Sequence, residues 1–172
     1  TDRHGISGKA YSFDGVDDHI SLNANIGNFG TSDFTMSAWL MKLDLITDGA
    51  VIGKRNDSVE PGMLVFASSP GYEISTSGGD YTVSTASRYQ TTNRWFHLIF
   101  KRSGHNLQLY LDNQLIDSVV TPSVHNFSNS AVTLIGARYS QGSIWHLWHG
   151  QIDNVRIYNR ALSAADVTAL YE

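Results

Sequence analysis

The amino-acid sequence predicts an all-β fold, either a sandwich or a barrel, from three observations. Apolar and polar residues alternate with a period of two in short segments along the chain, which is typical of strands with one buried face. Residues that favour turns separate these segments, and the 172-residue chain holds 15 glycines but 3 prolines. Its acidic residues are 13 aspartates and 3 glutamates, whereas helices normally use glutamate freely on their surfaces.

The expected strands occupy most of the chain. Residues 34–41 show the alternation clearly, because Phe34, Met36 and Leu40 would share one face while Thr35 and Ser37 lie on the other. The other expected strands are 9–13, 19–22, 50–54, 63–67, 72–76, 81–85, 95–101, 107–111, 115–119, 132–137 and 151–158. Hairpin turns are expected at 14–15, 77–80, 103–106 and 112–113.

A short helix is expected at the carboxyl-terminal end. Ser163, followed three residues later by Asp166, resembles a capping box. Val167, Leu170 and Tyr171 would then share one helical face.

The composition argues against several classes of function. The net charge is −4 and no run of lysine or arginine could follow a phosphate backbone, so a nucleic-acid partner is not expected. No stretch approaches the roughly 20 apolar residues that are needed to cross a bilayer. The absence of cysteine removes disulfides, thiolate zinc sites and cysteine nucleophiles.

The chain is expected to form one domain over residues 1–172. Its length is ordinary for a single domain, and no linker, repeat or low-complexity tract marks a boundary. The sequence opens with Thr1 and Asp2, without an initiator methionine or an apolar signal segment. We therefore expect a piece excised from a longer protein.

Segments spread over the whole chain carry a family resemblance. They are KAYSFDGVDDHI at 9–20, FTMSAWL at 34–40, NRWFHL at 93–98, LQLYLDN at 107–113 and GQIDNVRIYNRALS at 150–163. In this order and spacing they resemble the laminin-G-like jelly-roll domains of bacterial secreted proteins, within the concanavalin A-like lectin and glucanase group. The resemblance implies a two-sheet antiparallel jelly-roll sandwich whose first and last strands lie side by side. This fold carries lectins, catalytic domains and adhesion modules alike, so it does not select a function.

The resemblance also implies a structural calcium ion where the first and last strands meet. The side chains of Asp14 and Asp153 are the first candidate ligands, followed by the Gly15 carbonyl, Asp17 and Asp18. Calcium takes roughly six to eight oxygen ligands, which carboxylates and carbonyls supply. The alternative is that Asp14 and Gly15 form a turn alone, and that Asp153 accepts hydrogen bonds from nearby backbone donors.

Catalysis is not expected from the acidic residues. Catalytic relatives with this fold hydrolyse β-glucans with paired carboxylic acids about 5–5.5 Å apart. Here Glu60 lies in an expected loop, Glu73 stands alone in a strand and Glu172 is terminal. Asp17 and Asp18 are neighbours that would point to opposite strand faces. A polysaccharide-degrading enzyme is therefore the less favoured alternative.

Histidines are the other candidate for catalysis, because polysaccharide lyases of this architecture use them and the chain has seven. His97 lies within an alternating strand and is expected to be structural, while His105 and His125 lie in turns. His146 and His149 offer transition-metal ligands or a sugar platform, but a spacing of three brings imidazoles together on a helix and not in a loop. No G-x-S-x-G motif supports a serine nucleophile.

Aromatic residues in loops are the remaining candidates, because flat rings stack on sugars while amides and arginines bond the hydroxyls. Family members usually have an aromatic residue immediately before the Gly-x-Ile-Asp segment, which makes Trp148 structural and Trp145 the leading ligand candidate. The other expected ligand-binding residues are Tyr72, Tyr81, Tyr89, Arg88, Arg138 and His146, with Asn56 or Asp57 beside them. The alternative for each aromatic residue is a half-buried ring that covers the edge of the sandwich.

These observations predict a non-catalytic carbohydrate-binding module with one structural calcium. It would be secreted or at the cell surface, bind a polysaccharide or oligosaccharide, and be a monomer within a longer chain. The alternative is a laminin-G-like module that binds proteins or acts as a spacer in a surface adhesin. A groove lined by Trp145 and tyrosines would favour sugar, whereas a flat apolar patch of several hundred Å² would favour a protein.

Overall fold

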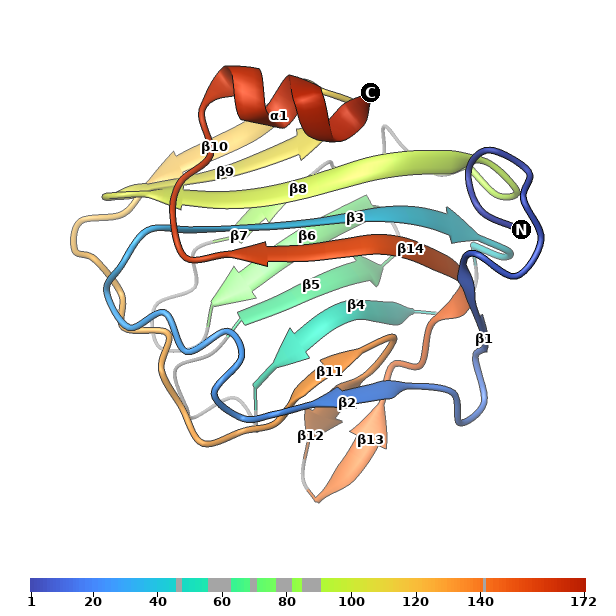
Figure 1. Ribbon diagram of the computed structural model, residues 1–172. Helices are drawn as coiled ribbons and strands as arrows, with labels where there is room; N and C mark the ends of the chain where they lie inside the picture. The colour runs from blue at the N-terminus through green and yellow to red at the C-terminus, as the bar shows by residue number, and fades with distance from the viewer. Residues whose placement is uncertain (46–47, 56–62, 69–70, 77–81, 85–90, 141) are drawn as a thin grey trace.

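Two six-stranded antiparallel sheets and a separate two-stranded hairpin make up the β-structure of the described residues in the computed structural model (Figure 1). The structure describes residues 1–45, 48–55, 63–68, 71–76, 82–84, 91–140 and 142–172. The two sheets face each other, so the predicted all-β sandwich with antiparallel strands is confirmed.

Sheet A contains the first and last strands of the chain. Its order is β1 (Tyr11–Asp14), β14 (His149–Tyr158), β3 (Phe34–Lys42), β8 (Trp95–Ser103), β9 (Asn106–Leu111) and β10 (Gln114–Val120). β1 pairs with β14, with Tyr11 opposite Ile152 and Asp14 opposite His149. The expected adjacency of the first and last strands is therefore confirmed.

Sheet B contains the shorter strands. Its order is β2 (Ile20–Leu22), β11 (Thr133–Ile135), β4 (Gly49–Lys54), β5 (Met63–Ser68), β6 (Gly71–Thr76) and β7 (Thr82–Ser84). Strand β12 (Arg138–Ser140) pairs with β13 (Ser143–Trp145) outside both sheets, and this hairpin projects from the lower end of the molecule in Figure 1.

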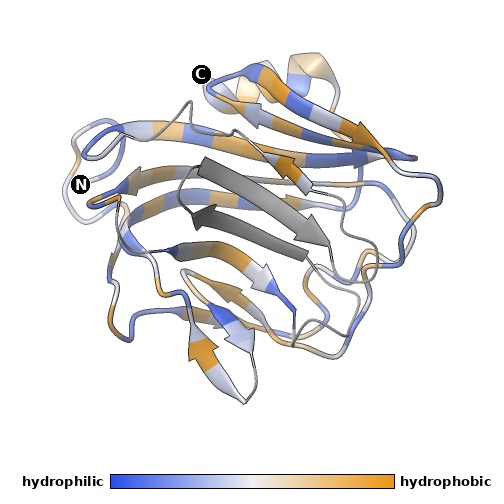
Figure 2. Cartoon of the chain, turned by 180° about the vertical axis from the view of Figure 1, so that it is seen from behind, coloured by the Kyte–Doolittle hydropathy of each residue, from blue (hydrophilic) through white to orange (hydrophobic). Residues whose placement is uncertain are grey.

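The core lies between the sheets and follows from the period-two pattern. Phe34, Met36, Ala38 and Leu40 are all at most 2% exposed and belong to one hydrophobic cluster. Phe34 stacks on Phe29 with ring centroids 4.2 Å apart. Figure 2 shows the corresponding alternation of hydrophobic and hydrophilic residues along the coloured strands.

The outer face of sheet A is covered by the two ends of the chain. Helix α1 (Ala164–Tyr171) begins after the predicted Ser163 cap, and Val167 packs in a small cluster with Ile99 and Leu162. The helix packs against Ile99 of β8 and Tyr110 of β9, and Figure 1 shows it at the end of the sheet where β9 and β10 lie. Because the two ends of the chain cover this face, Trp39 is only 8% exposed although it points away from the core.

The sequence prediction differs from the structure after residue 135. We expected one strand over 132–137, but β11 ends at Ile135 because Gly136 takes a φ of +80° beside the Phe13 ring. The chain then leaves sheet B and forms the β12–β13 hairpin, which the sequence pattern did not predict. No helix among the described residues is long and apolar enough to cross a membrane.

Candidate functional site

The β12–β13 hairpin brings together three of the residues that the sequence singled out. Arg138 lies directly opposite Trp145 in the hairpin register, and His146 follows Trp145. Directly opposed residues of an antiparallel pair lie on the same face with Cβ atoms about 4.5–5.5 Å apart. The Trp145 side chain is 54% exposed. An exposed aromatic ring therefore lies on the same face as Arg138, which is half-buried, with its Nε buried and its Cβ against Gly53 of β4.

The base of the hairpin is fixed to the sandwich by close packing and backbone hydrogen bonds. The Ala50 amide donates to the His146 carbonyl (2.7 Å), and the Trp148 amide donates to the Gly136 carbonyl (2.8 Å). A Cβ on Gly53 would lie 2.7 Å from the Ala137 carbonyl oxygen, so β4 and the start of β12 touch directly.

Trp145 and Trp148 differ in their surroundings as the sequence predicted. The Trp148 side chain is fully buried and belongs to the core cluster between the sheets. Trp145 is the last residue of β13, opposite the first residue of β12. A half-buried ring that covers the edge of the sandwich does not describe Trp145, because more than half of its surface is exposed.

His146 is half-buried where the hairpin returns to the sandwich. Burial lowers its pKa, the charge of Arg138 lowers it further, and Asp48 acts in the opposite direction. Its backbone is in the left-handed region with φ of +50°. The imidazole is therefore neutral at pH 7 and can both donate and accept a hydrogen bond.

The remaining ligand candidates are not placed by the structure. Tyr81, Arg88 and Tyr89 lie outside the described residues, as do Asn56 and Asp57. Tyr72 lies in β6 opposite Ala67, but its side chain is outside the description.

The Asp14–Asp18 turn forms an exposed group of three carboxylates. Ligand atoms of Asp14, Asp17 and Asp18 lie within 4.8 Å of one another, which is close enough to hold a metal ion. The Val16 amide donates to Asp14 Oδ1 (2.8 Å), and this hydrogen bond is the main cause of the lowered pKa of Asp14. The Asp14 amide in turn donates to Asp18 Oδ2 (3.0 Å). Asp14 therefore forms the hydrogen-bonded turn that the alternative interpretation predicted, and it also belongs to the group of three carboxylates.

The expected meeting of Asp153 with this turn is wrong. Asp14 lies opposite His149, four positions before Asp153 on β14, so about 13 Å of strand separates the two at a rise of about 3.3 Å per residue. The strands are adjacent, but they run antiparallel, and Asp153 lies beyond Tyr11 at the other end of β1. Its Oδ1 accepts a hydrogen bond from the Asn154 amide (2.7 Å), as the alternative predicted.

His149 contacts an acidic residue from a distant part of the chain. The His149 Nδ1 lies 2.5 Å from Asp44 Oδ2, which the sequence analysis did not anticipate because the two residues are 105 positions apart. Within the described part of the chain, the groups of three or more side chains that could hold a metal do not include His146 or His149. His97 is buried in sheet A, as expected for a structural histidine.

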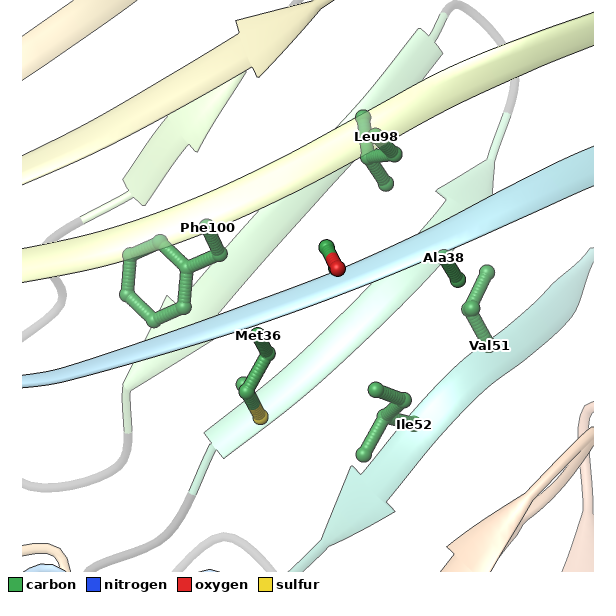
Figure 3. Close-up of a pocket in the computed structure, with 7 residues that line it drawn as sticks. Met36, Ala38, Val51, Ile52, Leu98 and Phe100 are labelled. Atoms are coloured by element: carbon green, nitrogen blue, oxygen red, sulfur yellow. The ribbon is translucent and has the colours of Figure 1, made fainter. Parts of the chain in front are cut away.

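The centre of the sandwich leaves no room for a ligand between β3, β8 and β4. The void that these strands surround has a volume of about 10 Å³ and is lined by Met36, Ser37, Ala38, Val51, Ile52, Leu98 and Phe100. Figure 3 shows the six apolar side chains of this lining around the void. Such a volume holds a single water molecule at most. A ligand at this part of the fold would have to bind outside the core.

Comparison with known proteins links the whole fold to a family and to solved sugar-binding structures. The family model that describes the concanavalin A-like lectin/glucanases superfamily matches residues 14–168. The chain is similar to the CBM40 of the Ruminococcus gnavus IT-sialidase, solved with α2,3-sialyllactose, at 10% identity over 95% of this chain and 98% of that chain, with a TM-score of 0.75.

Two further structures share the fold. Domain 4 of AbnA, a GH43 extracellular arabinanase from Geobacillus stearothermophilus solved with arabinotriose, matches at 20% identity over 98% of this chain and 79% of that one, with a TM-score of 0.69. The SAP-like pentraxin of Limulus polyphemus matches at 14% identity over 94% and 80%, with a TM-score of 0.70. At these identities the likeness concerns the fold. A comparison with curated proteins finds no match.

Proposed function

Because the chain belongs to the concanavalin A-like lectin/glucanases superfamily, we propose that it is a non-catalytic carbohydrate-binding module. The observation that carries the proposal is the pairing of the exposed Trp145 ring with Arg138 on one face of the projecting hairpin. The similar CBM40 and arabinanase domain, both solved with oligosaccharides, support a saccharide as the ligand.

The hairpin face has the chemistry that sugar recognition needs. The Trp145 ring offers a flat apolar surface for the C–H face of a sugar, and Arg138 offers planar N–H donors for hydroxyl or carboxylate oxygens. The His146 imidazole, whose lowered pKa favours the neutral form, follows Trp145 at the edge of this surface. We also propose Tyr72, Tyr81, Tyr89 and Arg88 as further contacts, on the sequence grounds given above.

We do not propose catalysis, because the positions of the glutamates in the sequence do not provide the pair of carboxylic acids that glucan hydrolysis needs. The chain contains three glutamates, which lie in an expected loop, in strand β6 and at the carboxyl terminus. A binding module needs no such pair, since affinity comes from stacking and hydrogen bonds alone.

We propose that calcium binds at the Asp14–Asp18 turn. The support is the convergence of Asp14, Asp17 and Asp18, whose carboxylate oxygens are hard ligands of the kind that calcium prefers. The Gly15 carbonyl remains a proposed ligand, while Asp153 is removed from the set by the β1–β14 register. The ion would stabilise the turn that follows β1.

We further propose that the 172 residues are one module of a longer secreted or surface protein, and a monomer within it. The support is the likeness to modules of larger proteins, among them a domain of an extracellular arabinanase. The partner of the module would then be a polysaccharide or oligosaccharide outside the cell.

A glycan array tests the proposed function. We expect wild-type protein to bind a defined set of glycans, Trp145→Ala to lose that signal, and Ile144→Ala to keep it. Ile144 is a matched control, because it lies next to Trp145 in β13, is 37% exposed and points to the opposite face of the hairpin. Melting temperatures of the three proteins check that each is folded.

Two results would contradict the proposal. One is a glycan signal that Trp145→Ala leaves intact, which would place the sugar elsewhere on the molecule. The other is an array without signal together with tight binding of a protein partner, which would favour the adhesion alternative.

A further inference from the structure

Strand β14 has an edge that β1 covers for part of its length. β1 pairs with positions from His149 to Ile152, and among the described residues no strand pairs with the same edge of β14 beyond Ile152. Figure 1 accordingly shows β1 at one end of β14. Two hollows follow this edge. A cavity of about 160 Å³ is lined in part by Asp153 and Asn154, and a groove of about 360 Å³ by residues nearer the end of the strand.

The larger hollow, which we call the edge groove, has a mixed polar and apolar lining without charge. Asparagines and apolar or aromatic residues contribute to it from the 23–29 loop and from the end of β14: Asn25, Ile26, Asn28, Ile157, Tyr158 and Asn159. Amides both donate and accept hydrogen bonds, and apolar and aromatic side chains pack against C–H groups. This combination suits a ligand with many hydroxyl groups and no net charge.

The side-chain amides of the edge groove have donors or acceptors that can bond a ligand. The Asn28 Oδ1 accepts from the Asn129 amide (3.0 Å), which orients the side chain and leaves its two N–H donors. The Asn25 and Asn159 residues are exposed, and their side chains make no hydrogen bond to any described residue.

The loop that forms one wall of the groove is held in place from below. The Lys54 side chain is 1% exposed, and its Nζ donates to the carbonyls of Ala24 (2.6 Å) and Ala131 (2.9 Å). The Thr133 hydroxyl donates to the Ile26 carbonyl (2.7 Å). Burying an ammonium group is costly unless it is well bonded, so this is strong anchoring for an exposed loop. A wall fixed in advance loses little entropy when a ligand binds.

The backbone at this edge is not suited to pairing with a peptide strand. The β14 register shifts between Asp153 and Arg156, and Asn154 has a φ of +49°. A bulge of this kind breaks the regular row of N–H and C=O groups that an added strand needs. A ligand that contacts side chains is therefore favoured over one that extends the sheet.

We infer that the edge groove is a second saccharide-binding site, which takes a neutral oligosaccharide. Its lining includes none of the residues of the β12–β13 hairpin, so the inference does not rest on the proposed function of that hairpin. The groove's volume of about 360 Å³ lies within the range of about 300–1,000 Å³ that is typical of ligand sites.

Nuclear magnetic resonance titration tests the inference directly. The probes are four neutral trisaccharides, arabinotriose, xylotriose, cellotriose and maltotriose, each added at millimolar concentration to ¹⁵N-labelled wild-type protein. We expect at least one of them to shift the side-chain NH₂ signals of Asn25, Asn28 and Asn159 in a saturable way. We expect the double variant Asn25→Ala, Asn159→Ala to weaken that binding at least tenfold.

Controls separate this site from the hairpin. Asn106→Ala removes an exposed amide on β9, three strands away from β14 in sheet A, and should leave the titration unchanged. Trp145→Ala should leave the shifts of the Asn25, Asn28 and Asn159 side-chain signals unchanged, whatever it does to binding at the hairpin. The inference is overturned if no trisaccharide shifts the three side-chain signals, if Trp145→Ala abolishes the shifts, or if an extended peptide shifts them and the sugars do not. Because the wild-type titration gives these readings, a double variant that fails to fold does not prevent the test.

Discussion

His97 is held on the outer face of sheet A between aromatic rings and cationic groups. Its imidazole stacks on Trp39 with ring centroids 5.0 Å apart and lies beside Tyr171. Burial, with the charges of Arg3 and Arg156, lowers the pKa of His97 to about 4. The side chain is 2% exposed, and its Nδ1 has no hydrogen-bond partner among the described residues. Protonation would place a charge on a buried ring whose Nδ1 has no acceptor among the described residues.

We therefore predict a pH dependence of stability that comes from His97. The unfolded chain takes up a proton on this residue below about pH 6.5, whereas the folded protein does so near pH 4, so the free energy of unfolding falls as the pH falls through this window. The contribution amounts to at most roughly 3–4 kcal/mol. Urea unfolding of wild type and His97→Gln at several pH values measures it. A difference between the two proteins that is the same at pH 4 and pH 7 would contradict the prediction.

A side chain at Gly136 would meet both backbone strain and a steric clash, whereas a side chain at Gly8 would meet backbone strain alone. The φ of Gly136 is +80°, and a Cβ there would lie 2.5 Å from the Phe13 ring, whereas Gly8 has a φ of +74° with nothing within 4 Å. We predict that Gly8→Ala costs roughly 1–2 kcal/mol of stability from backbone strain alone. Gly136→Ala should cost roughly 1–3 kcal/mol more, because the core is overpacked. Equal losses in urea unfolding would show that the Phe13 contact has no energetic weight.

At the scale of secondary-structure elements, the sequence patterns correctly predicted features that depend on residues close together in the chain. The alternation in 34–41 gave the buried face of β3, and the Ser163 and Asp166 pattern gave the start of α1. The β12–β13 hairpin escaped prediction because its strands are short and lie outside both sheets. All three positions of β13 are exposed, so hydrophobic periodicity does not mark this strand.

The start of α1 offers a test of element stability. Ser163 Oγ accepts from the Asp166 amide (3.1 Å), and the Asp166 side chain accepts from the Ser163 amide (2.9 Å). We predict that Ser163→Ala lowers the free energy of unfolding by about 1 kcal/mol, while Ser163→Thr restores most of it because threonine keeps the capping hydroxyl. Chemical denaturation of the three proteins checks this. Ser163→Ala without any loss would mean that α1 contributes little to the folded state.

At the scale of the whole molecule, the sequence predicted the sandwich but not the contacts that depend on register. The resemblance correctly placed β1 beside β14, yet it did not reveal that Asp14 meets His149, so it joined Asp14 to Asp153 wrongly. The side-chain amides of the edge groove come from residues more than 120 positions apart, as with Asn28 and Asn159. Only the folded arrangement shows that they share a groove.

Calcium binding is a property of the folded molecule and can be tested on its melting temperature. If the turn binds calcium, saturating ion should raise the melting temperature, since a ligand at 100 times its Kd stabilises the fold by about 2.7 kcal/mol. Asp17→Asn should remove this rise, because Asp17 contributes a carboxylate to the group. Asp153→Asn should keep it, since its place on β14 lies away from the turn. A melting temperature that calcium and chelator leave unchanged would contradict the proposed ion.

The measurement that tests the central claim most directly is calorimetric titration of the strongest glycan from the array into wild type, Trp145→Ala and Ile144→Ala. The account predicts that Trp145→Ala weakens the affinity at least tenfold, or by about 1.4 kcal/mol, and that Ile144→Ala binds as wild type does. Equal affinities of wild type and Trp145→Ala for that glycan would contradict the claim that the hairpin face binds the sugar.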